Sequence, residues 1–140
     1  MTKHNISGYP DSGDSNKATI IGICELADRE FIIADSFNKK VKLLDDSFKV
    51  VSHLTFPSTP RQMCNVSAYS VALIFDDRDL NFIRVNGQGI IVERIITFKH
   101  FCYGIGYHND DIFVTGANEI YCYSIEGLCK HKISIAQGMF

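Results

Sequence analysis

The chain has 140 residues, a length typical of one domain, and 46% of them are hydrophobic, which excludes a chain disordered by composition. The formal net charge of −2 gives no general field that would draw the chain to nucleic acid or to an acidic membrane. No apolar run approaches the roughly 18 residues that a membrane-spanning helix needs. We therefore expect no membrane contact and a cytoplasmic protein.

Residues 1–18 are polar and contain several Ser, Asp and Gly, so we expect a flexible leader. From residue 19 onward, the apolar residues come in short runs in which Val, Ile, Phe, Tyr and Thr are common, and turn residues separate the runs. No long stretch keeps a helical period. This pattern is typical of an all-β protein.

One strand-like segment recurs with a period near forty residues. Its landmark residues are Phe31, Val71 and Ile112, which are 40 and 41 residues apart. After a polar loop comes a second strand, then a hairpin turn and a third strand, and one more strand precedes each landmark. Each unit therefore has four short strands, and the period suits the blades of a propeller.

We predict an all-β, β-propeller-like fold of three consecutive four-stranded antiparallel blades in an incomplete ring, within residues 19–137. The blades cover about 19–57, 58–99 and 100–137. Half a ring leaves two blade faces without a neighbour, and uncovered apolar faces promote association. We expect the chain to self-associate or to be a fragment of a longer propeller.

The segment Ala34-Asp35-Ser36-Phe37-Asn38-Lys39-Lys40-Val41-Lys42-Leu43-Leu44 resembles the NHL repeat, with Lys40 in place of the usual Arg. The second blade keeps Asp76 of this motif, and the third keeps Asn118. The resemblance implies a propeller similar to those at the C-terminus of tripartite-motif proteins, which are ubiquitin ligases with a RING and a B-box. It implies target recognition here, with any ligase activity in a part that this sequence lacks.

Asp35 and Asn38 have structural roles in this interpretation. A carboxylate at Asp35 can accept hydrogen bonds from loop N–H groups, and Asn38 tolerates a left-handed backbone. We expect both residues to hold the loop and to contact no ligand.

The sequence shows no catalytic, metal or cofactor constellation. The five cysteines form no CxxC pair, and the five histidines show no HxxxH spacing. The enzyme alternative is a fragment of a metal-dependent, six-bladed lactonase-like hydrolase, whose axial metal ion would be held here by Glu25 and Asn65. We expect a non-catalytic module without a cofactor.

A protein partner is the first expectation, and single-stranded RNA is the alternative. Basic residues recur mostly in loops, and tyrosines that could stack on bases lie near them. Acidic residues occupy many of the same loops, which favours a protein partner. The predicted binding-surface residues are Lys39, Lys40, Arg61, Arg78, Lys99, Tyr103 and Tyr107.

Overall fold

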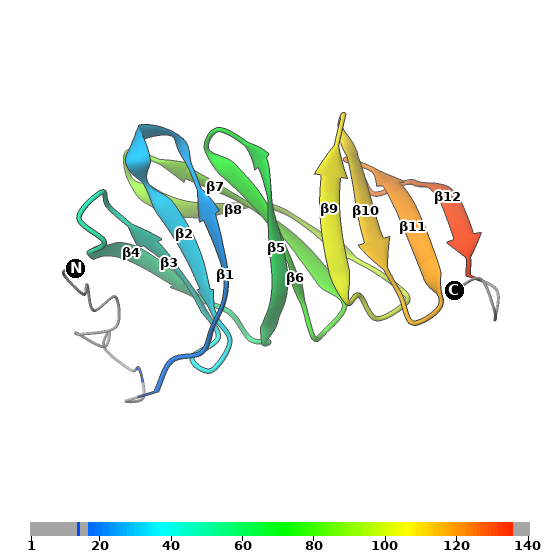
Figure 1. Ribbon diagram of the computed structural model, residues 1–140, viewed down its shortest axis with the longest axis horizontal. Coiled ribbons are helices and arrows are strands. Elements are labelled where there is room, and N and C mark those ends of the chain that lie inside the picture. The colour runs from blue at the N-terminus through cyan, green and yellow to red at the C-terminus, as the bar shows by residue number, and fades with distance from the viewer. Residues whose placement is uncertain (1–13, 15–16, 136–140) are drawn as a thin grey trace.

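The computed structural model describes Asp14 and residues 17–135, and within them the chain forms twelve strands in three four-stranded antiparallel sheets (Figure 1). The predicted leader, except Asp14 and residues 17–18, lies outside the described residues, as do residues 136–137 of the last predicted blade. No helix in the described part is long and apolar enough to cross a membrane. The all-β prediction with three four-stranded sheets is confirmed.

Each sheet is a meander in which consecutive strands pair. Blade 1 consists of β1 (Ile20–Glu25), β2 (Phe31–Asp35), β3 (Lys40–Leu44) and β4 (Val50–Thr55), with a short 3-10 turn, η1 (Ala27–Arg29), after β1. Blade 2 consists of β5 (Pro60–Ser67), β6 (Ser70–Phe75), β7 (Asp79–Asn86) and β8 (Gly89–Thr97). Blade 3 consists of β9 (Gly104–His108), β10 (Asp111–Thr115), β11 (Glu119–Ser124) and β12 (Cys129–Ser134).

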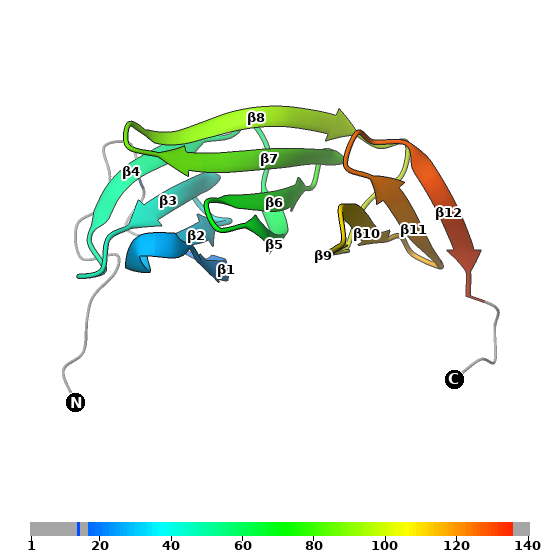
Figure 2. The same cartoon turned by 90° about the horizontal axis from the view of Figure 1, so that it is seen from above.

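The blades stand face to face along an arc, with β1, β5 and β9 on its inner side and β4, β8 and β12 on its outer side (Figure 2). One apolar core lies between blades 1 and 2, and a second lies between blades 2 and 3. Because successive side chains of a strand point to opposite faces, β6 supplies Val71 and Leu73 to the first core and Ala72 and Ile74 to the second. All six residues of β6 are buried, which explains its unbroken apolar sequence.

The meander places consecutive loops at alternate ends of the blades. We call the end that carries the β2–β3, β4–β5, β6–β7, β8–β9 and β10–β11 loops the linker end, because the connections between blades lie there. The other end, at the top of Figure 1, is the hairpin end. At the linker end, one backbone bond recurs in every blade: Phe56 N–H donates to Lys39 O, Phe98 N–H to Arg78 O and Ile135 N–H to Asn118 O.

Candidate interaction surface

The structure brings five of the seven predicted binding residues to the linker end. Three lie in loops, one is the second residue of β5, and one directly precedes β9: Lys39, Arg78, Lys99, Arg61 and Tyr103. All five are exposed. They come from all three blades or the connections between them, so the surface exists only when the blades are stacked.

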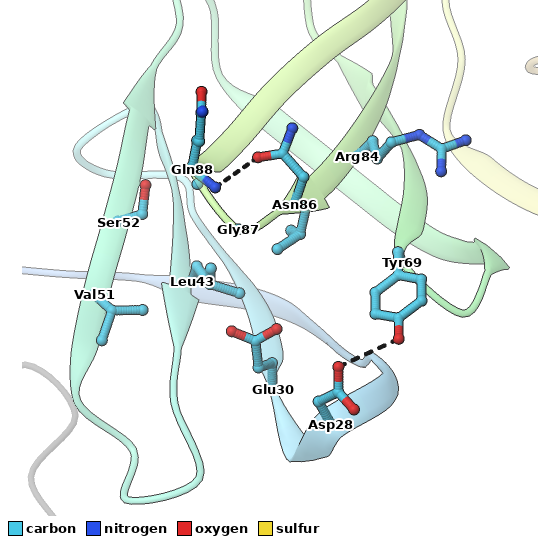
Figure 3. Close-up of a pocket in the computed structure, with 12 residues that line it drawn as sticks. Asp28, Glu30, Leu43, Val51, Ser52, Tyr69, Arg84, Asn86, Gly87 and Gln88 are labelled. Atoms are coloured by element: carbon cyan, nitrogen blue, oxygen red, sulfur yellow. Dashed lines mark hydrogen bonds between the residues drawn. The ribbon is translucent and has the colours of Figure 1, made fainter.

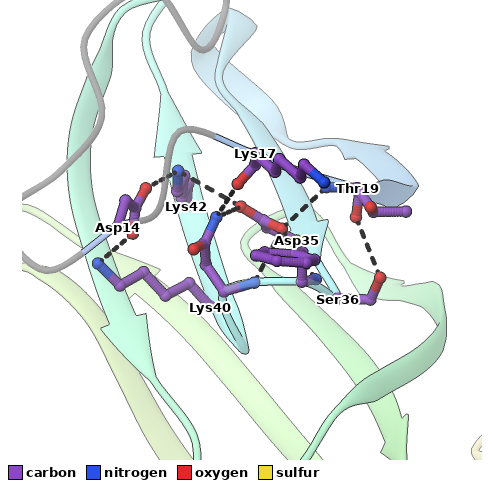
Figure 4. A network of polar contacts seen from close by, with 9 residues as sticks. Asp14, Lys17, Thr19, Asp35, Ser36, Lys40 and Lys42 are labelled. Atoms are coloured by element: carbon purple, nitrogen blue, oxygen red, sulfur yellow. Dashed lines mark hydrogen bonds and ion pairs between the residues drawn. The ribbon is translucent and has the colours of Figure 1, made fainter.

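Tyr107 and Lys40 lie elsewhere. Tyr107 is half-buried in β9 toward the hairpin end, where its hydroxyl donates to Asp110 at 2.8 Å. Lys40 is the first residue of β3 rather than part of a loop, and its side chain is 6% exposed. It pairs with Asp14 at 2.5 Å, and Lys42 pairs with the other Asp14 oxygen at 2.7 Å (Figure 4). Lys40 therefore presents no charge at the linker-end surface.

The β2–β3 loop is held as predicted at Asp35 but not at Asn38. Asp35 Oδ1 accepts hydrogen bonds from the backbone N–H groups of Thr19, Phe37 and Asn38 at 3.1, 3.1 and 3.2 Å. The positive φ of 55° falls on Lys39, so the prediction of a left-handed Asn38 is wrong. Asn38 instead donates its side-chain amide to Asp35 Oδ2 and to the Lys17 carbonyl, both at 2.7 Å.

Two arginines of the linker end lie over exposed aromatic rings. The Arg61 guanidinium is 5.0 Å from the centroid of Tyr103 and also donates to Asp76 at 2.8 Å. The Arg78 guanidinium is 5.3 Å from the centroid of Phe101. Cation–π contacts of this kind preorganise both partners at a surface.

The sequence interpretation missed Phe101 and Phe37. Their rings are 57% and 52% exposed at the linker end, beside the 46% exposed Tyr103. Both lie in loops between strands, outside the cores between blades. The usable signal was an aromatic residue in a loop whose neighbours are polar or basic, such as Phe37 before Asn38 and Lys39.

Charge is sorted between the two ends of the described chain. The segments outside strands at the linker end carry four cations and two carboxylates: Lys17, Lys39, Arg78 and Lys99, with Asp76 and Asp77. The corresponding segments at the hairpin end carry six carboxylates and two cations: Asp28, Glu30, Asp45, Asp46, Asp110 and Glu126, with Arg29 and Lys49. A chain of small net charge therefore has one cationic end and one anionic end.

A groove of about 720 Å³ opens at the hairpin end between blades 1 and 2 (Figure 3). Asp28, Glu30, Leu43 and Val51 line it. The Tyr69 hydroxyl donates to Asp28 at 3.2 Å, and the charge of Asp28 and this bond raise the pKa of Tyr69, with Glu30 adding to the effect. The groove suits a cationic side chain better than an acidic one.

The described residues offer little for covalent or metal chemistry. No group of three or more His, Cys, Asp or Glu side chains could hold a metal ion among them. Asn65, a ligand in the lactonase-like alternative, donates its amide to the Glu25 backbone carbonyl at 2.8 Å, which ties β5 to β1. Burial raises the pKa of Cys64 and of Cys102 to about 11, so both thiols are protonated at neutral pH.

No protein-family model matches the chain, and no curated protein is similar to it at a significant level.

The chain is similar to solved β-propeller structures at low sequence identity. It matches the β-propeller domain of Cps50 (Swd1) from Myceliophteria thermophila with a TM-score of 0.74 and 9% identity, over 87% of this chain and 45% of that one. It matches the WD40 β-propeller domain of Doa1 with a TM-score of 0.71 and 20% identity, over 84% and 41%. It matches BBS1N, solved in complex with ARL6DN, with a TM-score of 0.67 and 14% identity, over 84% and 40%.

These similarities show the fold, and the chain spans about two fifths of the length of the structures it matches. The three sheets are consecutive blades of an unclosed β-propeller.

Proposed function

We propose that this chain is a non-catalytic protein-interaction module whose linker end receives an acidic segment of a partner protein. The observation that carries the proposal is the pair of exposed cation–π contacts, Arg61 on Tyr103 and Arg78 on Phe101. Arg and aromatic residues are enriched where protein interfaces gain most of their binding energy. Their rings are already held by the arginines, so binding costs less side-chain entropy.

The charge of the linker end supports an acidic partner. Lys39 and Lys99 are exposed beside the two arginines, whereas the hairpin end would repel an acidic segment. Fields of this kind set partner choice and association rate more than affinity. BBS1N, a structural neighbour, was solved in complex with another protein, which fits a binding role for such a fold.

The target-recognition part of a ubiquitin ligase is a narrower form of this proposal. It rests on the resemblance of residues 34–44 to the NHL repeat of tripartite-motif propellers. Asp35 supports a structural use of that motif, since it caps backbone N–H groups inside the loop.

Single-stranded RNA is the second candidate, favoured by the same Arg–aromatic contacts, because bases stack on aromatic rings and guanidinium planes. Two observations make it second. Asp76 and Asp77 lie in the middle of the surface, and Asp76 already engages Arg61. A backbone of phosphates needs a continuous cationic track, whereas a short acidic segment needs only a few contacts.

Fluorescence anisotropy of labelled probes tests the proposal. A peptide of repeated Glu-Asp-Phe should bind the full chain with a Kd of about 10–100 µM, the weak range expected for a short flexible segment. Arg78→Glu should weaken binding at least about tenfold, or about 1.4 kcal/mol. Lys49→Glu makes the same charge change at the hairpin end and should leave binding nearly unchanged.

Three results would contradict the proposal: no binding of the peptide, equal weakening by both substitutions, or equal binding of a Lys-Lys-Phe repeat. A 20-nucleotide poly-uridine probe that binds more tightly than the peptide, with a steep loss on adding salt, would favour RNA instead. Thermal melts of both variants confirm that each remains folded.

A further inference from the structure

The surface of interest is the face of blade 3 turned away from blade 2. Within β10, Ile112 and Val114 point into the core between blades 2 and 3, and Phe113 points the other way. The pairing of strands places Phe113 beside Gly106 and Cys122, and Ile120 beside Ile133. The face therefore has an apolar centre, in which Phe113 is 38% exposed and Ile133 is 57% exposed.

The repeat shows what this face is built for. Ile32 and Ala72 stand at the corresponding position of blades 1 and 2, one residue after the landmarks Phe31 and Val71. Both are 0% exposed, because the next blade covers them. Phe113 is the third member of this series and has no blade over it among the described residues. The outward face of blade 3 is thus an interface between blades that lacks its second half.

The two outer blade faces differ, contrary to the expectation that both would be uncovered. On the face of blade 1 turned away from blade 2, Ile33 and Leu44 are 1% and 0% exposed. The same face holds Lys40 and Lys42, which pair with the 2% exposed Asp14 (Figure 4). Blade 3 of a second copy would meet buried ion pairs there, so head-to-tail closure of two half-rings is disfavoured.

We propose that blade 3 is a homotypic interface, in which the outward face of one copy packs against the same face of a second copy about a two-fold axis. Asp111 and Lys130 form an ion pair of 2.8 Å at the margin of the apolar centre. A two-fold arrangement lets charges of opposite sign face each other across the axis, as a self-complementary interface requires. This proposal goes beyond the proposed function and uses a different surface.

The size of the face limits the strength of the contact. Four strands of about five residues offer a footprint of about 17 Å by 19 Å, well below the roughly 800 Å² per partner of a standard stable interface. The dimer should therefore be weak, with a Kd in the micromolar range.

Analytical ultracentrifugation of the full chain tests this from about 1 µM to about 200 µM, which brackets a micromolar Kd. We expect a monomer–dimer equilibrium without larger species. Phe113→Glu should weaken the dimer at least thirtyfold while the melting temperature at low concentration stays nearly unchanged. Ile133→Lys provides a second disruption on an exposed edge strand, should Phe113→Glu fail to fold.

Ile23→Glu is the matched control, because Ile23 is 58% exposed on the outward side of blade 1. It should leave the dimer intact, and so should Arg78→Glu, which tests the linker end alone. A chain that stays monomeric throughout overturns the proposal. So does growth beyond the dimer, or weakening by Ile23→Glu as strong as that by Phe113→Glu.

Discussion

Replacing Asp35 by Ala removes a fully buried carboxylate on which the β2–β3 loop is built. Three backbone N–H groups and the Asn38 amide would lose their acceptor. Lys42, which lies 3.6 Å from Asp35, would lose one of its two carboxylates. A buried donor left without a partner costs about 1–3 kcal/mol.

The three N–H groups lie at a loop that water partly reaches, so the low end of that range applies to each. The sum is a loss of about 3–4 kcal/mol in the free energy of unfolding. Asp35→Asn keeps an acceptor oxygen but loses the charge, and should lose about half as much. Asp76→Ala is the control, because Asp76 is 48% exposed and its ion pair with Arg61 is at the surface. Such pairs contribute about 0–1 kcal/mol.

Urea unfolding at 25 °C, followed by circular dichroism, measures these differences. The loss for Asp35→Ala should also lower the melting temperature by about 10 °C, as expected for a domain of this size. If Asp35→Ala unfolds within about 1 kcal/mol of the parent and together with Asp76→Ala, the carboxylate does not hold the loop, and the reasoning from its hydrogen bonds fails.

Three further outcomes follow from single contacts. Burial raises the pKa of the Asp14 carboxyl, but its ion pairs with the two lysines of β3 outweigh this and hold the pKa below the usual 3.8. Its contribution is complete above the unfolded pKa and is lost as the pH falls through the folded pKa, so urea titrations should show a smaller acid-dependent loss in Asp14→Asn. Gly89→Ala should cost about 1–2 kcal/mol in thermal melts, because the φ of 116° strains any side chain and a Cβ would lie 2.9 Å from Ser52 Oγ, whereas Gly87→Ala has open space and should be nearly neutral. Cys129 is exposed while Cys24, Cys102 and Cys122 are buried, so a thiol reagent should modify Cys129 first and the buried thiols only on unfolding.

The repeat spacing was sufficient to predict the fold. Phe31, Val71 and Ile112 start equivalent strands, or lie one residue inside them, in all three blades. A strand has a side-chain period of two, and a blade is a closed unit of four strands, so a preserved spacing preserves the face to which each residue points. This is why an unbroken apolar run such as β6 could be interpreted as a strand with a blade on each side.

The loop motif could not be followed by letters alone. The sequence aligns Asp76 with Asp35, but the ladder pairs Asp35 with Ile20 and pairs Phe75 with Pro60, the equivalent strand start. Phe75 therefore occupies the buried position of Asp35, and Asp76 lies one residue further, in the exposed loop. Register is set by hydrogen bonds between strands, which a single motif does not contain.

Lys40 shows a second limit of the sequence. Its spacing placed it in a basic loop, yet it begins β3 and pairs with Asp14, 26 residues earlier in the chain. A lysine is seldom buried without a partner, and the partner here comes from outside the repeat. No periodicity within the blades could have identified it.

The arrangement of charge was within reach of the sequence once four strands per blade were assigned. In a meander, every second loop lies at the same end, so loop parity separates the carboxylates of the hairpin end from the cations of the linker end. The interpretation that acidic residues share the basic loops is correct only for Asp76 and Asp77. The ends are separated by a strand of about five residues, or about 17 Å. This is about two Debye lengths at physiological ionic strength, so the anionic end does not cancel the field at the cationic end. An acidic segment near the linker end therefore meets the local cations rather than the net charge of −2.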